Sequence, residues 1–347
     1  MNDEYTHGDS QKYLFLYIRH IFFRMLTQST YSNQISAAIE QAQFPLNPPK
    51  LYDPIRYILG LSGKRVRPLL VMLGADLFAC ADMESTIPAA LAVEYFHNFS
   101  LIHDDIMDEA PLRRGSMTVH KKWSENVAIL SGDALLVKAY EEIARCAPTK
   151  IPALLRVFNK MALEVCEGQQ IDMDFETQEQ VNQEAYIAMI RAKTSVLLGG
   201  ALQMGAILAD ATSEEQKLIY DFGVNLGIAF QLQDDILDVY GNPENFGKQV
   251  GGDILCDKKT ILRLHLQQLA NNADRELLSS LIEEKNADRK IQITKELYAK
   301  YGVREIADNL KVHYSDEAYK SLEAISVADT QKAALLNLAK NLMVRTY

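Results

Sequence analysis

Cysteine is scarce in this sequence, and the few cysteines stand far apart. Only 4 occur among 347 residues, at positions 80, 146, 166 and 256, and no two form a CxxC pair. This spacing argues against a disulfide framework and against a zinc knuckle, because both need suitably grouped thiols. A reducing compartment is the simplest setting for such a chain, so we expect a cytoplasmic protein.

Positive charge is also in deficit. The chain has 36 lysines and arginines against 46 aspartates and glutamates, which gives a formal net charge of −10. Proteins that bind the phosphate backbone of nucleic acids usually present a basic surface. We therefore expect no nucleic-acid partner, although a local group of cations is still able to bind a small anion.

Long apolar runs are the third absence. A helix that crosses a bilayer needs about 20 apolar residues in succession. The nearest approach is at residues 13–26, where Arg19, His20 and Arg24 interrupt the run and no signal-peptide cleavage site follows. We predict no transmembrane segment, an N-terminal extension at residues 1–24, and a single domain at residues 25–347.

Strand-like alternation is scarce, whereas apolar residues recur at helical spacing through most of the chain. Asp53 and Pro54 resemble a helix N-cap followed by proline at the first helical position. Short breaks, rather than an interdomain linker, separate the periodic segments. The pattern predicts an all-α protein that forms one large helical bundle. The clearest helical segments are residues 87–102, 127–143, 151–165, 186–208 and 216–237.

Two copies of an acidic motif dominate what is present. The chain reads DDIMD at residues 104–108 and DDILD at residues 234–238, both next to apolar residues. On a helix, the first and last aspartates share a face, whereas the second points about 100° away. A lone DDxxD is usually a solvated acidic face, but two copies in apolar surroundings need compensating cations, because close carboxylates repel one another.

Magnesium is the natural compensating cation, because it takes a few carboxylates and completes its shell with water and phosphate oxygens. The candidate metal ligands are therefore the aspartates of both motifs, namely Asp104, Asp105, Asp108, Asp234, Asp235 and Asp238.

Cations stand close to the first acidic motif in the sequence. Arg113 and Arg114 follow it in the loop 111–115, and an arginine fork suits bidentate binding of phosphate. Upstream, residues 60–68 place glycine beside Lys64, Arg65 and Arg67 just before an apolar helix, which is typical of an anion site at a helix N-terminus. It is not a P-loop, because GxxxxGK[ST] is absent.

Several motifs in order resemble those of the trans-prenyltransferases, the isoprenyl diphosphate synthases. They are GKRVRP, HNFSLIHDDIMDEAPLRRG, GQQIDMD, KTSVL and FQLQDDILDVYGNPENFGKQVGGDILCDKKT, between about residues 51 and 262. The resemblance implies an isoprenoid-synthase bundle around a central cavity, commonly a homodimer. It also implies that isopentenyl diphosphate is condensed with an allylic prenyl diphosphate, which binds together with three Mg²⁺ ions.

The resemblance also implies roles for individual residues. Asp104, Asp108 and Asp234 are the implied magnesium ligands, with Asp105, Asp235 and Asp238 in support. The implied partners of the allylic diphosphate are Arg113, Lys193, Lys248 and Lys258, and those of isopentenyl diphosphate are Lys64, Arg67, His97 and Arg114, with Arg65 assisting. Thr194 and Gln231 match positions beside the allylic group, where their dipoles would steady a carbocation after its diphosphate has left.

Product length is expected to depend on the residues before the first motif. Family resemblance implies that a bulky side chain five positions before Asp104 stops elongation early, and Phe99 stands there. Ser100 and Phe96 are the neighbouring candidates. We predict a C15 to C20 product; the structural alternative is that Phe99 packs in an interhelical core and other residues form the floor.

Three other functions are compatible with parts of the sequence. A terpene cyclase shares the fold, but usually carries an N-D-x-x-S-x-x-x-E motif in place of the second DDxxD. A silent regulatory subunit would be expected to lose carboxylates, and all six are present. His103 and Asp104 form an HD pair like that of metal phosphohydrolases, but the other ligands of such a site are not evident.

Overall fold

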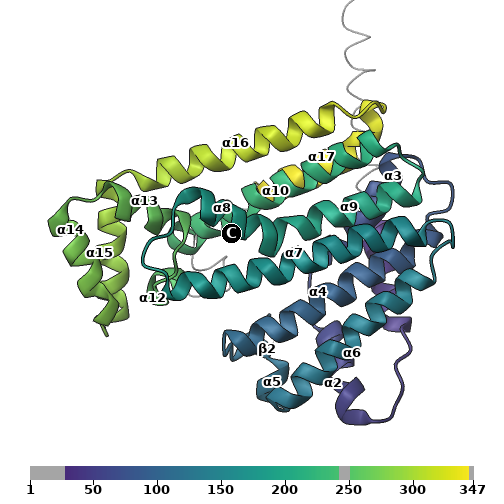
Figure 1. Cartoon of the computed structure of the whole chain (residues 1–347), viewed down its shortest axis with the longest axis horizontal. Helices are drawn as coiled ribbons and strands as arrows, with labels where there is room; N and C mark the ends of the chain where they lie inside the picture. Colours follow the sequence, from purple (N-terminus) through teal and green to yellow (C-terminus); the bar gives the residue numbers. More distant parts are fainter. Residues whose placement is uncertain (1–27, 242–250, 344–347) are drawn as a thin grey trace, which may run out of the picture. The chain divides into compact units, whose positions relative to one another are not determined.

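The computed structural model describes residues 28–241 and 251–343, which are helical almost throughout (Figure 1). Residues 28–41 are helical. The helices that follow are α2 (Pro49–Gly60), α3 (Val66–Leu77), α4 (Ile87–Met107), α5 (Val119–Lys122), α6 (Glu125–Ala144), α7 (Ile151–Thr177), α8 (Gln183–Ile190), α9 (Val196–Leu208), α10 (Ser213–Tyr240), α12 (Gly252–Leu255), α13 (Ile261–Leu269), α14 (Asn272–Ser280), α15 (Ala287–Lys300), α16 (Val303–Glu323) and α17 (Asp329–Met343). A π turn, Arg191–Ser195, joins α8 to α9, and the strands described are β1 (Leu112–Arg113) and β2 (Ser116–Met117). The predicted all-α fold is confirmed.

Side-chain caps explain several helix starts. Ser124 accepts a hydrogen bond from the amide of Val127 at the start of α6, and Asn182 does the same for Ala185 at the start of α8. The prediction of a helix start at Asp53 is wrong. Helix α2 begins at Pro49, which itself occupies the first helical position, so that Pro54 lies inside the helix. Asp53 pairs instead with Arg56, at 2.6 Å.

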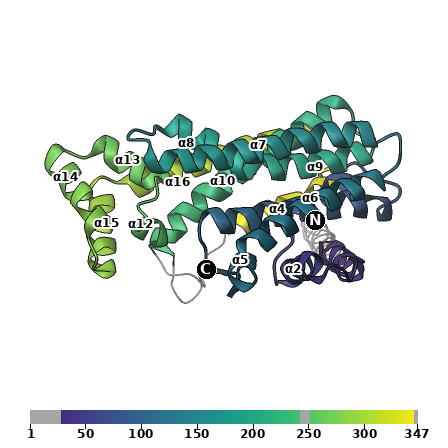
Figure 2. The same ribbon diagram turned by 60° about the horizontal axis from the view of Figure 1, so that its bottom comes forward.

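The described residues fall into two compact units. The first contains residues up to Phe158 together with Ala201–Lys217 and Ser326–Leu338. Helices α4 and α6 lie side by side in it (Figures 1 and 2). Its core includes the buried side of α4, and α3 approaches residues 201–208 closely, because Gly74 and Gly205 carry no side chain at the contact.

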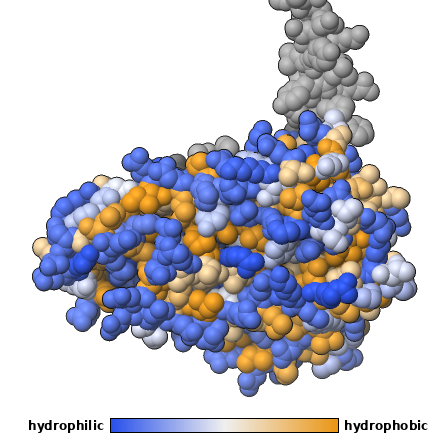
Figure 3. Space-filling model, turned by 45° about the horizontal axis from the view of Figure 1, so that its top comes forward, coloured by the Kyte–Doolittle hydropathy of each residue, from blue (hydrophilic) through white to orange (hydrophobic). Residues whose placement is uncertain are grey.

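The second unit contains Asn159–Gly200, Leu218–Ile325 and the residues after Leu338. Its hydrophobic core joins α8, α10, α13, α15 and α16. The core side chains include Tyr186, Leu232, Ile236, Leu262, Tyr298 and Val303. On the face drawn in Figure 3, hydrophobic residues are interspersed among hydrophilic ones.

One helical stretch of the described residues, Gln183–Leu208, is long and apolar enough to cross a membrane by length and composition alone. However, 67% of its most apolar window is buried inside the protein, as in the core helix of a globular protein. The predicted extension at residues 1–24 lies outside the described residues, and the single domain at residues 25–347 remains a prediction.

Candidate active site

The first acidic cluster, Asp104, Asp105 and Asp108, stands at the C-terminal end of α4, where Asp108 is the C-cap. The side chain of Asp105 is only 1% exposed, whereas that of Asp104 is 20% exposed and Asp108 is exposed. The outer two aspartates therefore remain accessible and the middle one is buried, as their positions on one helix predict.

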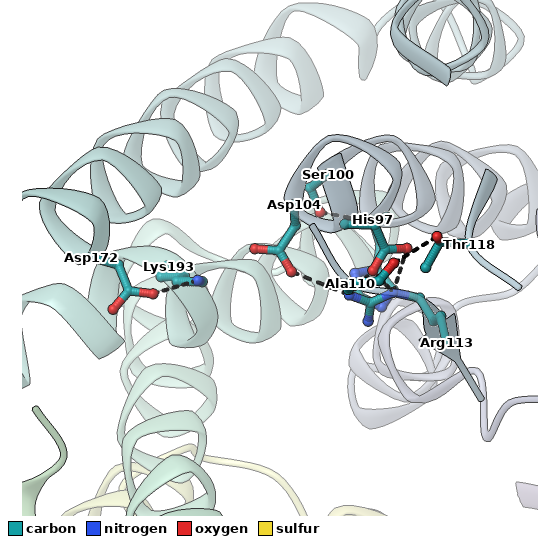
Figure 4. A network of polar contacts seen from close by, with 9 residues as sticks. His97, Ser100, Asp104, Ala110, Arg113, Thr118, Asp172 and Lys193 are labelled. Carbon is teal, nitrogen blue, oxygen red and sulfur yellow. Dashed lines mark hydrogen bonds and ion pairs between the residues drawn. The ribbon is translucent and has the colours of Figure 1, made fainter. Parts of the chain in front are cut away.

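Arg113 holds the first cluster together (Figure 4). Its Nε donates to both carboxylate oxygens of Asp105, at 2.7 and 2.8 Å, and its Nη2 donates to Asp104, at 3.2 Å. Burial raises the pKa of Asp105, and the hydrogen bond and charge of Arg113 oppose that rise. The sequence correctly placed this arginine beside the acids.

A tight hairpin carries Arg113 and Arg114. The pairing of β1 with β2 leaves Arg114 and Gly115 as a two-residue loop, and both have positive φ, as a type I′ turn requires. The guanidinium of Arg114 lies against Gly63, where an added Cβ would come within 2.7 Å of its Nη1. The absence of a side chain at Gly63 therefore lets the loop before α3 approach Arg114.

A second group of cations forms where α3 begins and α4 passes. Arg67 Nη1 lies 3.1 Å from Nε2 of His97, which is a buried residue of α4. Burial lowers the pKa of Arg67 to about 10, and the charge of Arg114 adds to that shift while Glu94 opposes it. Burial, and then the charges of Arg67 and Arg114, holds the pKa of His97 well below its usual 6.5. Lys64 is exposed in the same loop.

Glu94 is a residue of this region that sequence reasoning missed. Its side chain is 1% exposed and accepts hydrogen bonds from Arg65, at 2.5 Å, and Asn98, at 2.8 Å. Arg65 also donates to the carbonyls of Leu59 and Leu61. Arg65 thus fixes the end of α2 to α4, which differs from the expected role beside a substrate. The signal was a lone acid within the apolar run of α4.

The second acidic cluster, Asp234, Asp235 and Asp238, lies near the end of α10. Asp235 is buried, and the other two are partly exposed. Asp235 accepts hydrogen bonds from the Tyr186 hydroxyl, and from the Ile261 amide and the Gln231 side chain, both at 3.4 Å. Burial, and then the charge of Asp253, raises the pKa of Asp235 to about 7.

Asp238 supports the segment that carries Lys258. Its Oδ2 accepts a hydrogen bond from the amide of Asp253 in α12, at 3.0 Å, and the carbonyl of Asp253 accepts from the amide of Lys258, at 2.9 Å. The neighbouring Asp257 pairs with the largely buried Arg263 and Lys290, at 2.9 and 2.5 Å. Lys248 lies outside the described residues.

Lys193 and Thr194 belong to the π turn. Lys193 Nζ donates to Asp172 of α7, at 2.6 Å, and Figure 4 shows the two side chains directed at each other. A π turn inside an otherwise α-helical stretch is often found at a functional site. The candidate Lys193 is therefore fixed by a carboxylate from the GQQIDMD motif.

Two of the candidates for product length, Phe96 and Phe99, belong to a cluster of aromatic rings beside α4. Phe96 is buried and contacts the rings of Phe99 and Phe158, with centroid distances of 5.7 and 5.5 Å. Tyr140 of α6 extends the cluster, with its ring centroid 5.1 Å from that of Phe158. Phe99 is half-buried, and the Ser100 hydroxyl donates to the carbonyl of His97.

His103 does not act with Asp104. Its ring meets the ring of Phe99 edge to face, with centroids 4.7 Å apart, and its Nε2 lies 3.2 Å from the carbonyl of Ile129 in α6. These contacts account for His103 as a packing residue between α4 and α6 and give no support to a phosphohydrolase HD pair.

The acidic clusters suit magnesium better than a metal that needs a full protein cage. Among residues 28–241 and 251–343, no group of three or more His, Cys, Asp or Glu side chains converges on a metal position. Each cluster instead has two carboxylates that are at least partly exposed, Asp104 with Asp108 and Asp234 with Asp238. Magnesium is usually held by one or two carboxylates and by the phosphates of a substrate, so the donor set fits.

Comparison with known families decides the identity. A model described as polyprenyl synthetase matches residues 48–301, which is more than half of the chain. The chain belongs to the polyprenyl synthetase family. It is accordingly an enzyme of the isoprenyl diphosphate synthase class.

Known polyprenyl synthetases are similar to this protein along almost the whole chain. A geranylgeranyl diphosphate synthase of Methanosarcina mazei is 35% identical, with 91% of this chain and 96% of the relative covered. A crystal structure of a geranylgeranyl pyrophosphate synthase is 44% identical with a TM-score of 0.86, covering 93% of this chain and 99% of that one. A polyprenyl synthase of Caulobacter crescentus, complexed with calcium and isoprenyl diphosphate, is 26% identical with a TM-score of 0.80, covering 95% and 98%.

Family membership and these relatives do not favour a terpene cyclase or a silent regulatory subunit. The site residues that were not predicted from the sequence support the residues of the polyprenyl synthetase motifs. Tyr186 holds Asp235, and Glu94 and Asp257 anchor the segments that carry Arg67 and Lys258. Of these supports, Glu94 was visible in the sequence as a lone acid within an apolar run. Tyr186 was not, because it lies 49 residues from its partner Asp235.

Proposed function

We propose that this enzyme condenses isopentenyl diphosphate with an allylic prenyl diphosphate in a magnesium-dependent reaction. One observation carries the proposal beyond family membership: both DDxxD motifs bury the middle aspartate on protein partners and leave the outer two at least partly exposed. Two such carboxylates per motif are enough for magnesium when it arrives with a diphosphate. Asp104, Asp108, Asp234 and Asp238 are the proposed ligands, and Asp105 and Asp235 support them.

The cations are assigned to two diphosphates by their motifs. For the allylic diphosphate we propose Arg113, Lys193, Lys248 and Lys258. For isopentenyl diphosphate we propose Lys64, Arg67, His97 and Arg114. The pKa of Arg67 and of His97 is lowered by burial and by neighbouring positive charge, so an anion bound there would be favoured electrostatically.

The proposed reaction begins when the allylic C–O bond breaks and the diphosphate leaves with the electron pair. Magnesium, when bound, supplies positive charge that stabilises this leaving group. Arg113, Lys193 and Lys258 donate hydrogen bonds to its oxygens and hold them in place. The oxygens of Thr194 and Gln231 orient toward the allylic cation. The double bond of isopentenyl diphosphate then forms the new C–C bond, and the released diphosphate takes the proton that is lost.

The proposed product is a C15 to C20 prenyl diphosphate, with C20 favoured. Phe99 supports early termination, because its ring packs on Phe96, which in turn packs on Phe158, so that bulky rings occupy this part of α4. The geranylgeranyl synthases among the relatives support C20.

We further propose a cytoplasmic homodimer. Helix α6 exposes Ile129, Leu130, Val137 and Tyr140 along one side, and Leu130 and Val137 are 60% and 59% exposed. Such a row of large apolar side chains on a helix surface is typical of a protein interface. Sedimentation equilibrium of the wild type and of Val137→Glu would test this, and we expect a dimer that the substitution weakens.

Product analysis tests the function directly. The purified enzyme is incubated with isopentenyl diphosphate and with C5, C10 or C15 allylic diphosphates, with and without magnesium, and chain lengths are measured. We expect elongation up to C20 only when magnesium is present. Cyclised hydrocarbon, or no consumption of isopentenyl diphosphate with any primer, would contradict the proposal.

A further inference from the structure

The π turn Arg191–Ser195 is seated against one side of α7. Three residues of α7 at four-residue spacing meet it: Glu164, Gly168 and Asp172. Residues four apart share one side of a helix, so the three form a continuous row. No motif assignment gives Gly168 or Glu164 a function.

Gly168 sits at the centre of this row and is buried. A Cβ at this position would clash with the backbone nitrogen of Lys193, and would lie 2.6 Å from its Cα and 2.7 Å from the carbonyl carbon of Ala192. These neighbours are backbone atoms, which cannot rotate away as a side chain can. Any larger residue at position 168 must therefore push the π turn off α7.

Ion pairs fix the turn on both sides of Gly168. One turn earlier, Glu164 lies 3.6 Å from Arg191, the first residue of the π turn. One turn later, Asp172 lies 2.6 Å from Nζ of Lys193. The row of α7 thus sets both the distance of the turn and the direction of the Lys193 side chain.

The opposite side of the turn is also in close contact with a glycine. A Cβ at Gly227 of α10 would come within 2.7 Å of Cα and Cβ of Ser195. Ser195 Oγ donates to the carbonyl of Ile190, five residues earlier, at 3.2 Å. The π turn is therefore held between α7 and α10 at backbone distance.

We propose that Gly168 is a positioning residue, which seats the π turn so that Lys193 and Thr194 are correctly placed for the allylic substrate. This inference rests on the proposed function, which assigns those two residues to that substrate. A displacement of about 1 Å at a substrate-orienting group can lower the rate about 100-fold. Gly168 acts through the position of Lys193 and makes no contact of its own with the substrate.

The test compares Gly168→Ala with Gly200→Ala. Both replace a buried helical glycine of the same unit, so the gain in helix propensity is the same. The added methyl at position 200 meets Sδ of Met161, which can move, whereas at position 168 it meets backbone. The rate of acylation of Lys193 by an amine-selective reagent, read by peptide mass spectrometry, reports the position of Lys193 without any turnover.

We expect Gly168→Ala to raise the labelling rate of Lys193 several-fold and to lower kcat about 100-fold, with Gly200→Ala within about threefold of the wild type in both. In the Lys193→Gln background, Gly168→Ala should cost less, because the part of its effect that acts through Lys193 is already lost. A merely structural role would lower thermal stability with kcat unchanged per folded molecule.

Each outcome has a distinct meaning. Unchanged labelling of Lys193 in Gly168→Ala, or fully additive losses in the double variant, would overturn the inference. Altered labelling with normal kcat would overturn the catalytic part, because the placement of Lys193 would not matter to the reaction. If the wild type transfers no prenyl group, the proposed function is refuted. The labelling rate of Lys193 then still tests whether Gly168 sets the position of the π turn.

If Gly168→Ala does not fold, Glu164→Gln keeps the shape and removes the charge that pairs with Arg191. We then expect a smaller loss of kcat, about tenfold, and faster labelling of Lys193. Wild-type values for both would overturn the inference.

Discussion

The two DDxxD motifs have the same spacing and the same pattern of burial but are compensated differently. In the first, the buried Asp105 is bound by a cation, Arg113, which also reaches Asp104. In the second, the buried Asp235 is held by a neutral phenol, an amide and a side-chain amide group. The middle carboxylate is therefore an internal support in both motifs, but only in the first is it held by an ion pair, with the partly buried Arg113.

The largest loss of activity is expected when an outer carboxylate is removed. The loss should be the same for both motifs. Asp104→Ala and Asp234→Ala should each lower kcat about 1,000-fold, because each removes a ligand of the charge that stabilises the leaving group. The thermal unfolding temperature should change little in either variant, because carboxylate repulsion falls, while Asp104→Ala also removes the 3.2 Å contact with Arg113. Asp316→Ala, on the exposed side of α16, is the matched control, and a loss in only one motif would break the comparison.

The middle carboxylates should separate the motifs. Asp105→Asn leaves Arg113 beside a neutral group and should lower the free energy of unfolding by about 3 kcal/mol, the loss expected when one partner of a buried pair is removed. Asp235→Asn keeps an acceptor for Tyr186 and strands no cation, so about 1 kcal/mol is expected. Urea unfolding measures both, and equal losses would contradict the difference drawn here.

The buried His97, near the first motif, should make the protein sensitive to acid, and the buried His265 of α13 adds to that sensitivity. The pKa of His97 lies well below 6.5 in the folded protein, so below about pH 6.5 the unfolded chain binds a proton that the folded chain does not. Stability therefore falls as the pH falls, by at most about 1.4 kcal/mol per pH unit for this group. Between pH 6.5 and 5, the urea midpoint should fall less in His97→Gln than in the wild type. An unchanged slope would remove His97 as the cause.

The smallest effect on the reaction rate is expected for a substitution that changes the length of the product. The residue that sets this length should lie near the first motif and not near the second. Phe99→Ala opens space next to Phe96 on α4 without removing a charge, so the main product should lengthen by about one isoprene unit. Leu237→Ala, one position before Asp238, is the control at the second motif. Chain-length analysis that finds the same product from Phe99→Ala would exclude Phe99 as the determinant.

The sequence allowed much of the fold to be predicted, because helices in this chain bury one periodic side. Residues 87–102, 127–143 and 216–237 were predicted as helical and lie inside α4, α6 and α10. The helix start was predicted wrongly at Asp53 because an aspartate before a proline usually marks the first turn of a helix. Here Pro54 lies inside α2, which begins at Pro49.

The candidate site was predictable where its partners are close in sequence. Arg113 is eight residues from Asp105, and their pairing follows from one helix end and one short hairpin. Tyr186 and the π turn were not predictable, because both depend on contacts between helices. The π turn follows from the close approach of α7 and α10 to one backbone segment, at Gly168 and Gly227.

The most direct test of the central claim is the binding of inorganic diphosphate by calorimetry, with and without magnesium, to the wild type, Asp104→Ala and Asp234→Ala. We expect magnesium to strengthen the binding of diphosphate to the wild type and either substitution to remove this enhancement. Binding that is independent of magnesium, or an enhancement that survives in either variant, would contradict it.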